Sequence, residues 1–269
     1  GVAFGTLPLG VEIARVWAKE YHYPFENSGD LAKVAQYLAV ERDPMFPKEE
    51  ILRRFITDAS VPDFTEPDEP HAVLASLPLP IYMTTNYDDF MIQALEKQGK
   101  APVRELCHWN TRINYYLEEH PSVFASNLSF KPTAGAPVVF HLHGHDSLAD
   151  SLVLTEDDYL DFLVQTARDQ DLLPHQIQRA LTGSSLLFIG YSLQDWDFRV
   201  LFRGLIRSTE PSLRRISVTV QLPPSTEAQK IQEYLHRYFH QDMIRVYWGT
   251  AREFAAELRR RWEEFNHEP

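Results

Sequence analysis

Residues 81–89 read IYMTTNYDD, an apolar run that leads directly into polar side chains, among them Asn86 and Asp88. Residues 138–145 read VVFHLHGH and repeat the arrangement with imidazoles. In a parallel α/β sheet, ligands bind beyond the carboxyl ends of the strands. The two stretches therefore predict neighbouring strands of a parallel sheet, with polar groups gathered at one edge.

Strands and amphipathic helices alternate along the rest of the chain. Residues 184–189 are apolar without alternation, as is typical of a strand buried on both faces. Alternation of this kind predicts an α/β fold with a Rossmann-like, doubly wound and mostly parallel sheet. The expected helices include residues 9–19, 30–39, 47–56, 172–181, 195–206 and 226–239, and further strands are expected at 216–220 and 244–247.

We expect a single domain over residues 1–269, with a helical insert at about 21–75 and an irregular excursion at about 108–136. The chain opens on a glycine-rich segment that leads into a helix, with Gly1, Gly5 and Pro8 in it. Because a sheet fold rarely begins with a loop, we expect a first strand and part of a phosphate-binding loop upstream of residue 1.

Composition narrows the classes of function. The chain has 26 basic and 38 acidic residues, a net charge of −12, and it lacks the basic stripe that is typical of nucleic-acid binders. A single cysteine provides neither a disulfide framework nor a C-x-x-C zinc pair, which suits a reducing cytosol. No apolar run approaches the roughly 20 residues of a membrane span. We therefore expect a cytoplasmic protein that contacts neither nucleic acid nor membrane.

The turn after residues 81–84 allows two interpretations. The Asn86 amide can both donate and accept hydrogen bonds, so it suits sugar hydroxyls and a water molecule, and the Asp88 carboxylate can face a cation or an amide. Alternatively, Asn86 caps the next helix and Asp88 interacts with its dipole. The two interpretations are compatible, because caps often lie where strands meet helices.

Three histidines alternate at His141, His143 and His145, and on a continuing strand they would share one face. Such spacing is compatible with a metal site that also uses Asp146 or Asp150. Gly144 is expected to break the strand, and we favour one catalytic imidazole with neighbours that serve structure. Three ordinary loop histidines are the remaining alternative.

Residues 190–192 read GYS and end the apolar strand at 184–189. Gly190 permits close approach of the backbone to a ligand, and the Ser192 hydroxyl can bind a ribose or a phosphate. The alternative is a tight strand–helix turn in which Ser192 caps the following helix.

Taken in chain order, these segments resemble the sirtuin superfamily, and more narrowly the bacterial sirtuin-like domains that hydrolyse NAD in anti-phage defence. The resemblance rests on the glycine-rich opening, on residues 84–88 (TTNYD), which are similar to a T-x-N-x-D motif, on residues 141–144 (HLHG) and on residues 190–192 (GYS). It spans nearly the whole chain. The protein also departs from the deacylating sirtuins, because Cys107 alone cannot supply their zinc module of two C-x-x-C pairs.

The resemblance implies an NAD glycohydrolase that releases nicotinamide and ADP-ribose, with no metal, and that depletes NAD during infection. It implies His143 as general base, Asn86 as the group that orients water and ribose, and Asp88 near the nicotinamide. The implied NAD-binding residues are Gly1, Gly5, Pro8, Thr85, Gly144, Gly190 and Ser192.

Such domains commonly form oligomers and respond to a partner sensor, so we expect a homo-oligomer or a partner protein, and we expect this chain to be a piece of a larger protein or complex. A catalytically silent NAD or ADP-ribose sensor is the main alternative function. A metal-dependent hydrolase built on the alternating histidines is the other.

Overall fold

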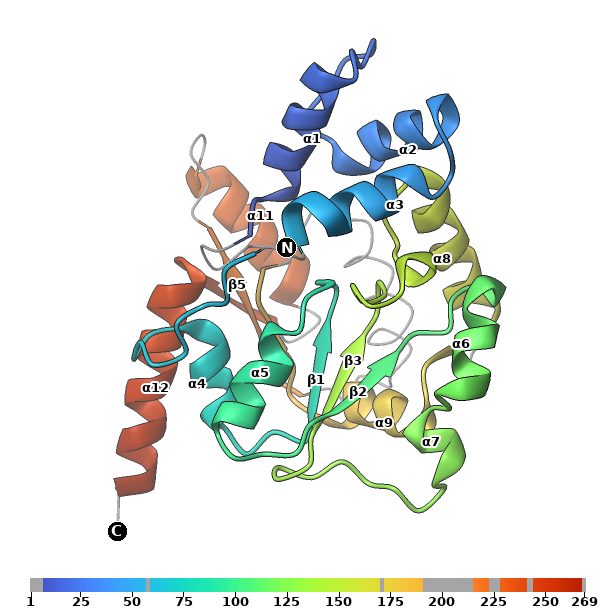
Figure 1. Cartoon of the computed structure of the whole chain (residues 1–269). Helices are drawn as coiled ribbons and strands as arrows, with labels where there is room; N and C mark the ends of the chain where they lie inside the picture. The colour runs from blue at the N-terminus through green and yellow to red at the C-terminus, as the bar shows by residue number, and fades with distance from the viewer. Residues whose placement is uncertain are drawn as a thin grey trace. The chain divides into compact units, whose positions relative to one another are not determined.

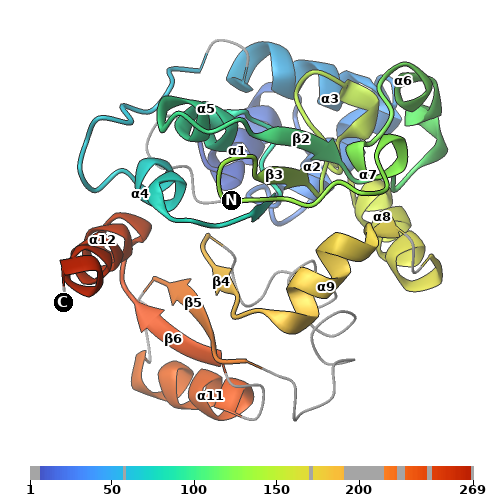
Figure 2. The same ribbon diagram turned by 90° about the horizontal axis from the view of Figure 1, so that it is seen from below.

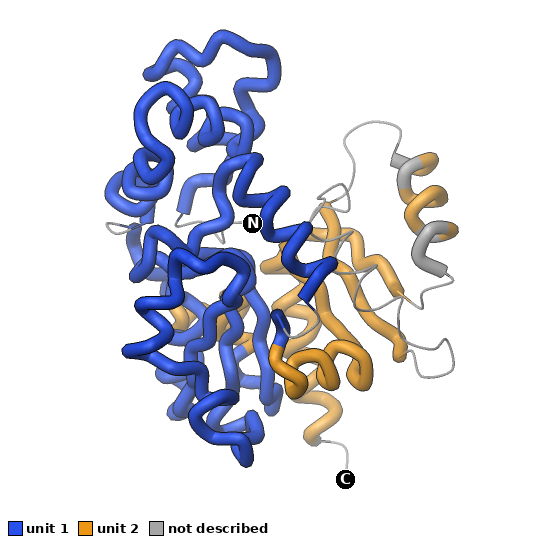
Figure 3. Tube along the Cα trace, turned by 90° about the vertical axis from the view of Figure 1, so that its right-hand side faces the viewer, with its two compact units in different colours: residues 1, 3–63, 75–173 blue, residues 2, 64–74, 174–269 orange. Residues whose placement is uncertain are grey.

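The computed structural model of the chain describes residues 7–56, 59–169, 172–190, 215–222, 228–240 and 244–267. They fall into two compact units (Figure 3): unit 1 holds the described residues within 3–63 and 75–173, and unit 2 those within 64–74 and 174–269. The prediction of a single domain over residues 1–269 stays a prediction.

Unit 1 contains a three-stranded parallel sheet in the order β1-β3-β2. Its strands are β1 (Ile81–Thr84), β2 (Val103–Leu106) and β3 (Val138–His141), and Figure 1 shows their arrows pointing the same way. The central strand β3 is buried along its whole length. In the register Thr84 of β1 lies opposite His141 of β3, so these two strands end at the same level.

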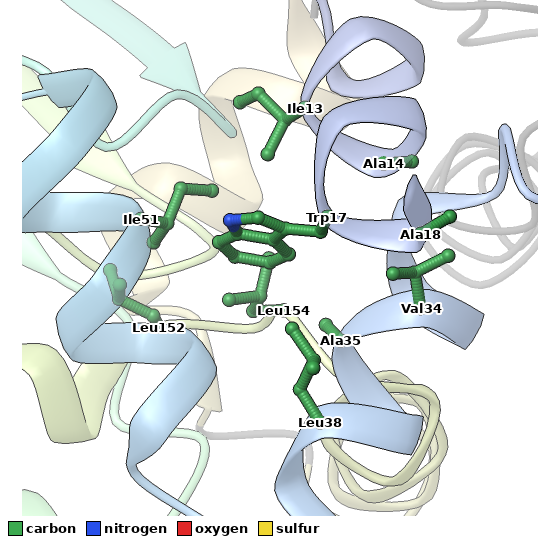
Figure 4. Packing of buried hydrophobic residues seen from close by; sticks show 10 residues of the cluster. All are labelled: Ile13, Ala14, Trp17, Ala18, Val34, Ala35, Leu38, Ile51, Leu152 and Leu154. Carbon is green, nitrogen blue, oxygen red and sulfur yellow. The ribbon is translucent and has the colours of Figure 1, made fainter. Parts of the chain in front are cut away.

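A helical cluster forms a second core in unit 1. It is built by α1 (Gly10–Glu20), α2 (Leu31–Glu41) and α3 (Phe46–Ile51), which continues into the π-helical segment η1 (Leu52–Ile56). Figure 4 shows the fully buried indole of Trp17 at the centre of this cluster. Leu152 and Leu154 pack into the same cluster, which connects the helices to the segment that follows β3.

The remaining helices of unit 1 lie between and after the three strands along the chain. They are α5 (Phe90–Lys97), η2 (Thr111–Ile113), α6 (Asn114–Glu119), α7 (Val123–Ser126), η3 (Ala149–Ser151) and α8 (Glu156–Arg168). A capping box starts α8, because the Thr155 hydroxyl accepts the N–H of Asp158 at 3.1 Å and the Asp158 carboxylate accepts the N–H of Thr155 at 2.9 Å. The excursion at 108–136 thus contains three short helical segments, η2, α6 and α7.

Unit 2 contains a second three-stranded parallel sheet in the order β4-β5-β6, visible in Figure 2. Its elements are β4 (Leu187–Phe188), β5 (Ser217–Gln221), β6 (Ile244–Trp248), α9 (His175–Gly183), α11 (Ala228–His240), α12 (Ala251–His267) and the start of α4 (Pro70–Ser76). Within this unit Arg252 of α12 contacts Glu66 at 2.6 Å and Asp68 at 3.1 Å. These ion pairs join the segment at 64–74 to the last helix.

The predicted α/β fold with parallel strands is confirmed, and every strand pair among the described residues is parallel. The sequence-based prediction did not include β2, which carries Arg104 and Glu105 among its four residues. The helix expected at 195–206 lies outside the described residues. No helix in the described ranges combines the length and the apolar character that a membrane crossing needs. Cys107, directly after β2, is fully buried.

Candidate active site

Asn86 and His143 occupy equivalent places on neighbouring strands. Thr84 and His141 are partners in the parallel register, and each of the two candidate residues follows two positions beyond its strand partner. Because β1 and β3 run side by side in the same direction, the loops that carry the amide and the imidazole leave the same edge of the sheet. The sequence prediction that these loops share one edge is therefore confirmed by the strand register.

Hydrogen bonds join the two loops directly. The N–H of Leu142 donates to the carbonyl oxygen of Thr84 at 2.8 Å, and the N–H of Asp146 donates to that of Tyr87 at 2.9 Å. The Tyr87 hydroxyl donates to the carbonyl oxygen of Val153 at 2.7 Å. We call residues 84–89 the amide loop and residues 141–147 the imidazole loop. The two backbone bonds lie at Thr84 and Tyr87, so this part of the amide loop follows the imidazole loop.

Inside the amide loop, side chains hold the backbone. The Thr84 hydroxyl accepts the N–H of Asn86 at 2.9 Å, and the Asp88 carboxylate accepts the N–H of Phe90 at 3.0 Å. Asp88 is buried and lies one residue before the N-cap residue of α5, Asp89. Asp88, rather than Asn86, therefore supports the first turn of α5, and the ligand-binding roles of both residues stay predictions.

The His143 ring is enclosed. Its side chain is 2% exposed, and it meets the rings of Tyr159 and Phe162 of α8 edge to face, with centroids 5.5 and 5.1 Å away. Burial among these groups lowers the pKa of His143 to about 3, so the ring is neutral at physiological pH. The expectation that His143 and Asn86 face one shared cleft stays a prediction.

The other two histidines point elsewhere. The chain leaves the strand after His141, so the alternation along a continuing strand does not persist. The rings of His141 and His145 lie against each other, 4.8 Å apart between centroids and nearly perpendicular, whereas the His143 ring packs on α8. The three imidazole rings therefore lie in two different environments. His141 and His145 are both buried.

His145 belongs to a charged network. Its Nε2 carries a proton, because it lies 3.0 Å from a carboxylate oxygen of Asp89, which only accepts, and its Nδ1 lies 3.1 Å from both the backbone nitrogen of Ser147 and a carboxylate oxygen of Asp146. Arg104 of β2 binds both oxygens of the same carboxylate. Burial alone would raise the pKa of Asp89, but hydrogen bonds from His145 and Arg104 outweigh it and lower that pKa to about 2.

Three side chains have potential metal-ligand atoms within 4.8 Å of one another: Asp89, His141 and His145. Such a cluster is a candidate metal site. A divalent cation there would have to displace the Nε2 proton of His145 and would lie beside the Arg104 guanidinium. Arg104 and His145 thus already bind the Asp89 carboxylate through charge and hydrogen bonds. These contacts favour a structural, hydrogen-bonded role for Asp89 and His145 over a metal centre.

The backbone conformation and a close contact both require glycine at position 144. Its φ is +87°, and an added Cβ would lie 2.2 Å from the carbonyl oxygen of Ser151. The neighbouring N–H of His145 donates to the Ser151 hydroxyl at 3.0 Å, so the turn closes onto η3. An NAD-binding role for Gly144 stays a prediction beside this structural one.

The other predicted NAD-binding residues are scattered or undescribed. Thr85 lies in the amide loop and Pro8 directly before α1, both partly buried. Gly190 lies in unit 2, two residues beyond β4, and has φ +79°. Gly1, Gly5 and Ser192 lie outside the described residues.

Sequence reasoning missed Arg104 and gave Asp89 a role only at the start of the next helix, not in the site. The only signal for Asp89 was its place beside Asp88. Nothing in the sequence links Arg104 to Asp89, because their contact depends on how β2 pairs with β3.

Comparison with known proteins agrees with this architecture. A family model described as SIR2-like domain matches residues 80–246. The NAD(+) hydrolase ThsA of Acinetobacter baumannii (strain 532279) is 28% identical over 184 residues, which are 68% of this chain and 33% of that protein. The NAD(+) hydrolase ThsA of Bacillus cereus (strain MSX-D12) is 25% identical over 200 residues, 74% of this chain and 36% of that protein.

The chain spans about a third of the length of these curated relatives. The SIR2-like model, by contrast, covers more than half of the 269 residues and includes both loops at the sheet edge. The resemblance seen in the motifs is thereby confirmed, and the chain belongs to the SIR2-like domain family.

Proposed function

We propose that this domain hydrolyses NAD at the bond between nicotinamide and ribose. The observation that carries the proposal is the equivalent position of Asn86 and His143 on the adjoining ends of β1 and β3. Membership in the SIR2-like family supports it, and so do the relatives named NAD(+) hydrolase.

Cleavage of this bond needs little acid catalysis from the protein. The ring nitrogen of the nicotinamide in NAD is cationic and leaves as a neutral pyridine nitrogen, taking the electron pair of the glycosidic bond. Positive charge develops at the anomeric carbon, as in glycoside cleavage generally. Water adds there and loses a proton, giving ADP-ribose, nicotinamide and one proton. The site must hold the ribose and direct one water molecule.

In this proposal Asn86 orients the water and a ribose hydroxyl, because its amide donates and accepts at once. His143 accepts the proton, Asp88 lies near the nicotinamide or the developing cation, and Thr85 and Gly144 contribute to binding. From other parts of the chain, Pro8, Gly190, Gly1, Gly5 and Ser192 are proposed to contact the rest of the dinucleotide.

Because the His143 ring is enclosed, the proposed reaction needs an additional step. A base of pKa about 3 is neutral but accepts protons weakly. Movement of the Tyr159 and Phe162 side chains away from the ring would admit water and raise the pKa of His143 toward its ordinary value of about 6.5. NAD binding is proposed to accompany this opening.

We further propose that the domain works in the cytoplasm, in anti-phage defence, where NAD depletion stops the infected cell. On this proposal it acts within a homo-oligomer or with a partner sensor. The activity of the whole protein, its trigger and its assembly all belong to this proposal, because the chain spans about a third of its relatives.

Incubation of the full-length protein with NAD, in its native assembly and with chromatographic detection of nicotinamide and ADP-ribose, tests the proposal. Stoichiometric release of both products is expected. Absence of release from an assembly that binds NAD would overturn hydrolysis and support the second candidate, a silent NAD or ADP-ribose sensor. The enclosure of His143 by Tyr159 and Phe162 is the observation that favours this second candidate.

A further inference from the structure

The backbone of Asn86 is held by side chains on both of its polar groups. Its N–H donates to the Thr84 hydroxyl at 2.9 Å, and its carbonyl oxygen lies 3.2 Å from Nδ1 of His141. Neither bond belongs to the regular ladder of the sheet, because β1 ends at Thr84. The direction in which the Asn86 side chain leaves the backbone therefore depends on two identifiable side chains.

The hydrogen bond from His141 has a defined sense. A carbonyl oxygen only accepts, so Nδ1 of His141 carries the proton and donates. The ring is fully buried and ends β3, the central strand of its sheet. Burial, and next the charge of the neighbouring His145, lower the pKa of His141 to about 3. The ring therefore keeps one tautomer at physiological pH.

The surrounding network fixes the His141 ring from the other side. The ring of His145 stands nearly perpendicular to it, with centroids 4.8 Å apart. His145 is itself held by Asp89 and by the backbone N–H of Ser147. Since Asp89 follows Asn86 by three residues and is bound by Arg104, the middle and the end of the amide loop contact the same group of side chains.

We propose that His141 is a positioning residue for Asn86: its Nδ1–H holds the Asn86 carbonyl so that the amide meets the water and the ribose in a fixed orientation. This inference rests on the proposed NAD hydrolysis. Misplacement of a reacting group by about 1 Å costs on the order of 100-fold in rate. A positioning role therefore acts on turnover more than on the binding of NAD.

Two substitutions separate the hydrogen bond from the bulk of the ring. His141→Asn places an amide N–H near the position of Nδ1 and keeps the donor, whereas His141→Leu fills the space without one. Steady-state kinetics with NAD, on the full-length assembly, are expected to show kcat lowered about 10- to 100-fold by His141→Leu with KM changed less than about 3-fold. His141→Asn is expected to recover kcat to within about 5-fold of wild type.

Two further variants test whether a loss of kcat comes from the hydrogen bonds to Asn86 or from lower stability. Phe124→Ala removes a buried ring of α7 that packs on Phe130, outside both loops, and is expected to lower stability without changing kcat. Thr84→Val removes the second tether on Asn86 and is expected to lower kcat as His141→Leu does, which supplies a measurement if His141→Leu fails to fold.

Wild-type kcat in folded His141→Leu, no recovery in His141→Asn, or an equal loss in Phe124→Ala would overturn the positioning role. A folded Thr84→Val variant with unchanged kcat would overturn it as well. If the wild-type assembly itself releases no nicotinamide, the proposed function fails and this inference fails with it. The two failures are thus distinguished by the wild-type protein.

Discussion

Lys48 and Asp158 form a buried ion pair, with Nζ 2.8 Å from Oδ1 and neither side chain more than 7% exposed. The ammonium also lies 5.7 Å from the centroid of the Trp109 ring. The other carboxylate oxygen accepts the backbone N–H groups of Leu154 and Thr155. One carboxylate therefore closes the capping box of α8 and neutralises a cation of α3, which fixes the start of the helix that covers His143.

The two partners are expected to differ when each is removed. Asp158→Ala leaves a buried ammonium without its counter-ion and is expected to lower the free energy of unfolding by about 3–5 kcal/mol. Lys48→Met leaves the carboxylate with two backbone donors and is expected to cost roughly half as much. Urea titration of both variants measures the difference. Equal losses, or a larger loss for Lys48→Met, would contradict this account.

Acid is expected to destabilise the protein through its buried histidines. The pKa values of His141 and His143 are about 3 in the folded chain, against about 6.5 when unfolded. The unfolded chain therefore takes up protons between those values and the folded chain does not, so stability is present above pH 6.5 and is lost as pH falls. Each ring contributes about 1 kcal/mol per pH unit.

Denaturant titrations between pH 6.5 and 4.5 measure this slope. The Asp89 carboxylate, with a pKa of about 2 in the folded chain, adds its own loss only below that range. His141→Leu is expected to reduce the slope by about 1 kcal/mol per pH unit. An unfolding free energy that stays constant over this range would show that the rings are not held neutral.

Gly144→Ala is expected to be among the most damaging single-methyl additions in unit 1. The new Cβ would meet the Ser151 carbonyl at 2.2 Å, at φ +87°, so the turn that follows His143 would have to move. A loss of more than about 3 kcal/mol is expected. Gly135→Ala is the matched control, because nothing lies within 4 Å of its Cβ position. Thermal unfolding measures the melting temperatures of both variants. Similar melting temperatures would refute the steric account.

Asn86→Ala and His143→Ala are each expected to lower NAD turnover at least ~100-fold, the range for loss of an orienting group or a general base. Controls of the same residue types are Asn127→Ala and His120→Ala, both at exposed positions. Chromatography of released nicotinamide compares the four variants. Turnover at the wild-type rate in folded Asn86→Ala and His143→Ala would exclude both residues from catalysis.

Local sequence rules predicted much of the fold. The helix expected at residues 9–19, which the structure has at Gly10–Glu20, and the strand that ends at His141 follow from short-range patterns. The strand β2 escaped prediction because Arg104 and Glu105 interrupt its apolar pattern. In the structure both charges have partners, since Arg104 binds Asp89 and Glu105 accepts the N–H of Val123.

The candidate site was predictable in its position and not in its environment. Motifs at strand ends located Asn86 and His143, because the carboxyl ends of parallel strands share one edge. The enclosure of His143 depends on α8, which begins more than ten residues later. The donor on the Asn86 carbonyl comes from His141, 55 residues along the chain. Contacts of this range follow from packing and leave no periodic signal in the sequence.

Cys107 is the only cysteine of the chain, and burial raises the pKa of its thiol far above the usual range. A thiol held in this way reacts slowly with alkylating reagents while the protein is folded. This domain is therefore a suitable background for site-specific fluorescent labelling. A cysteine introduced on the outer face of α8 would carry a dye alone, and its emission would report movement of that helix during turnover.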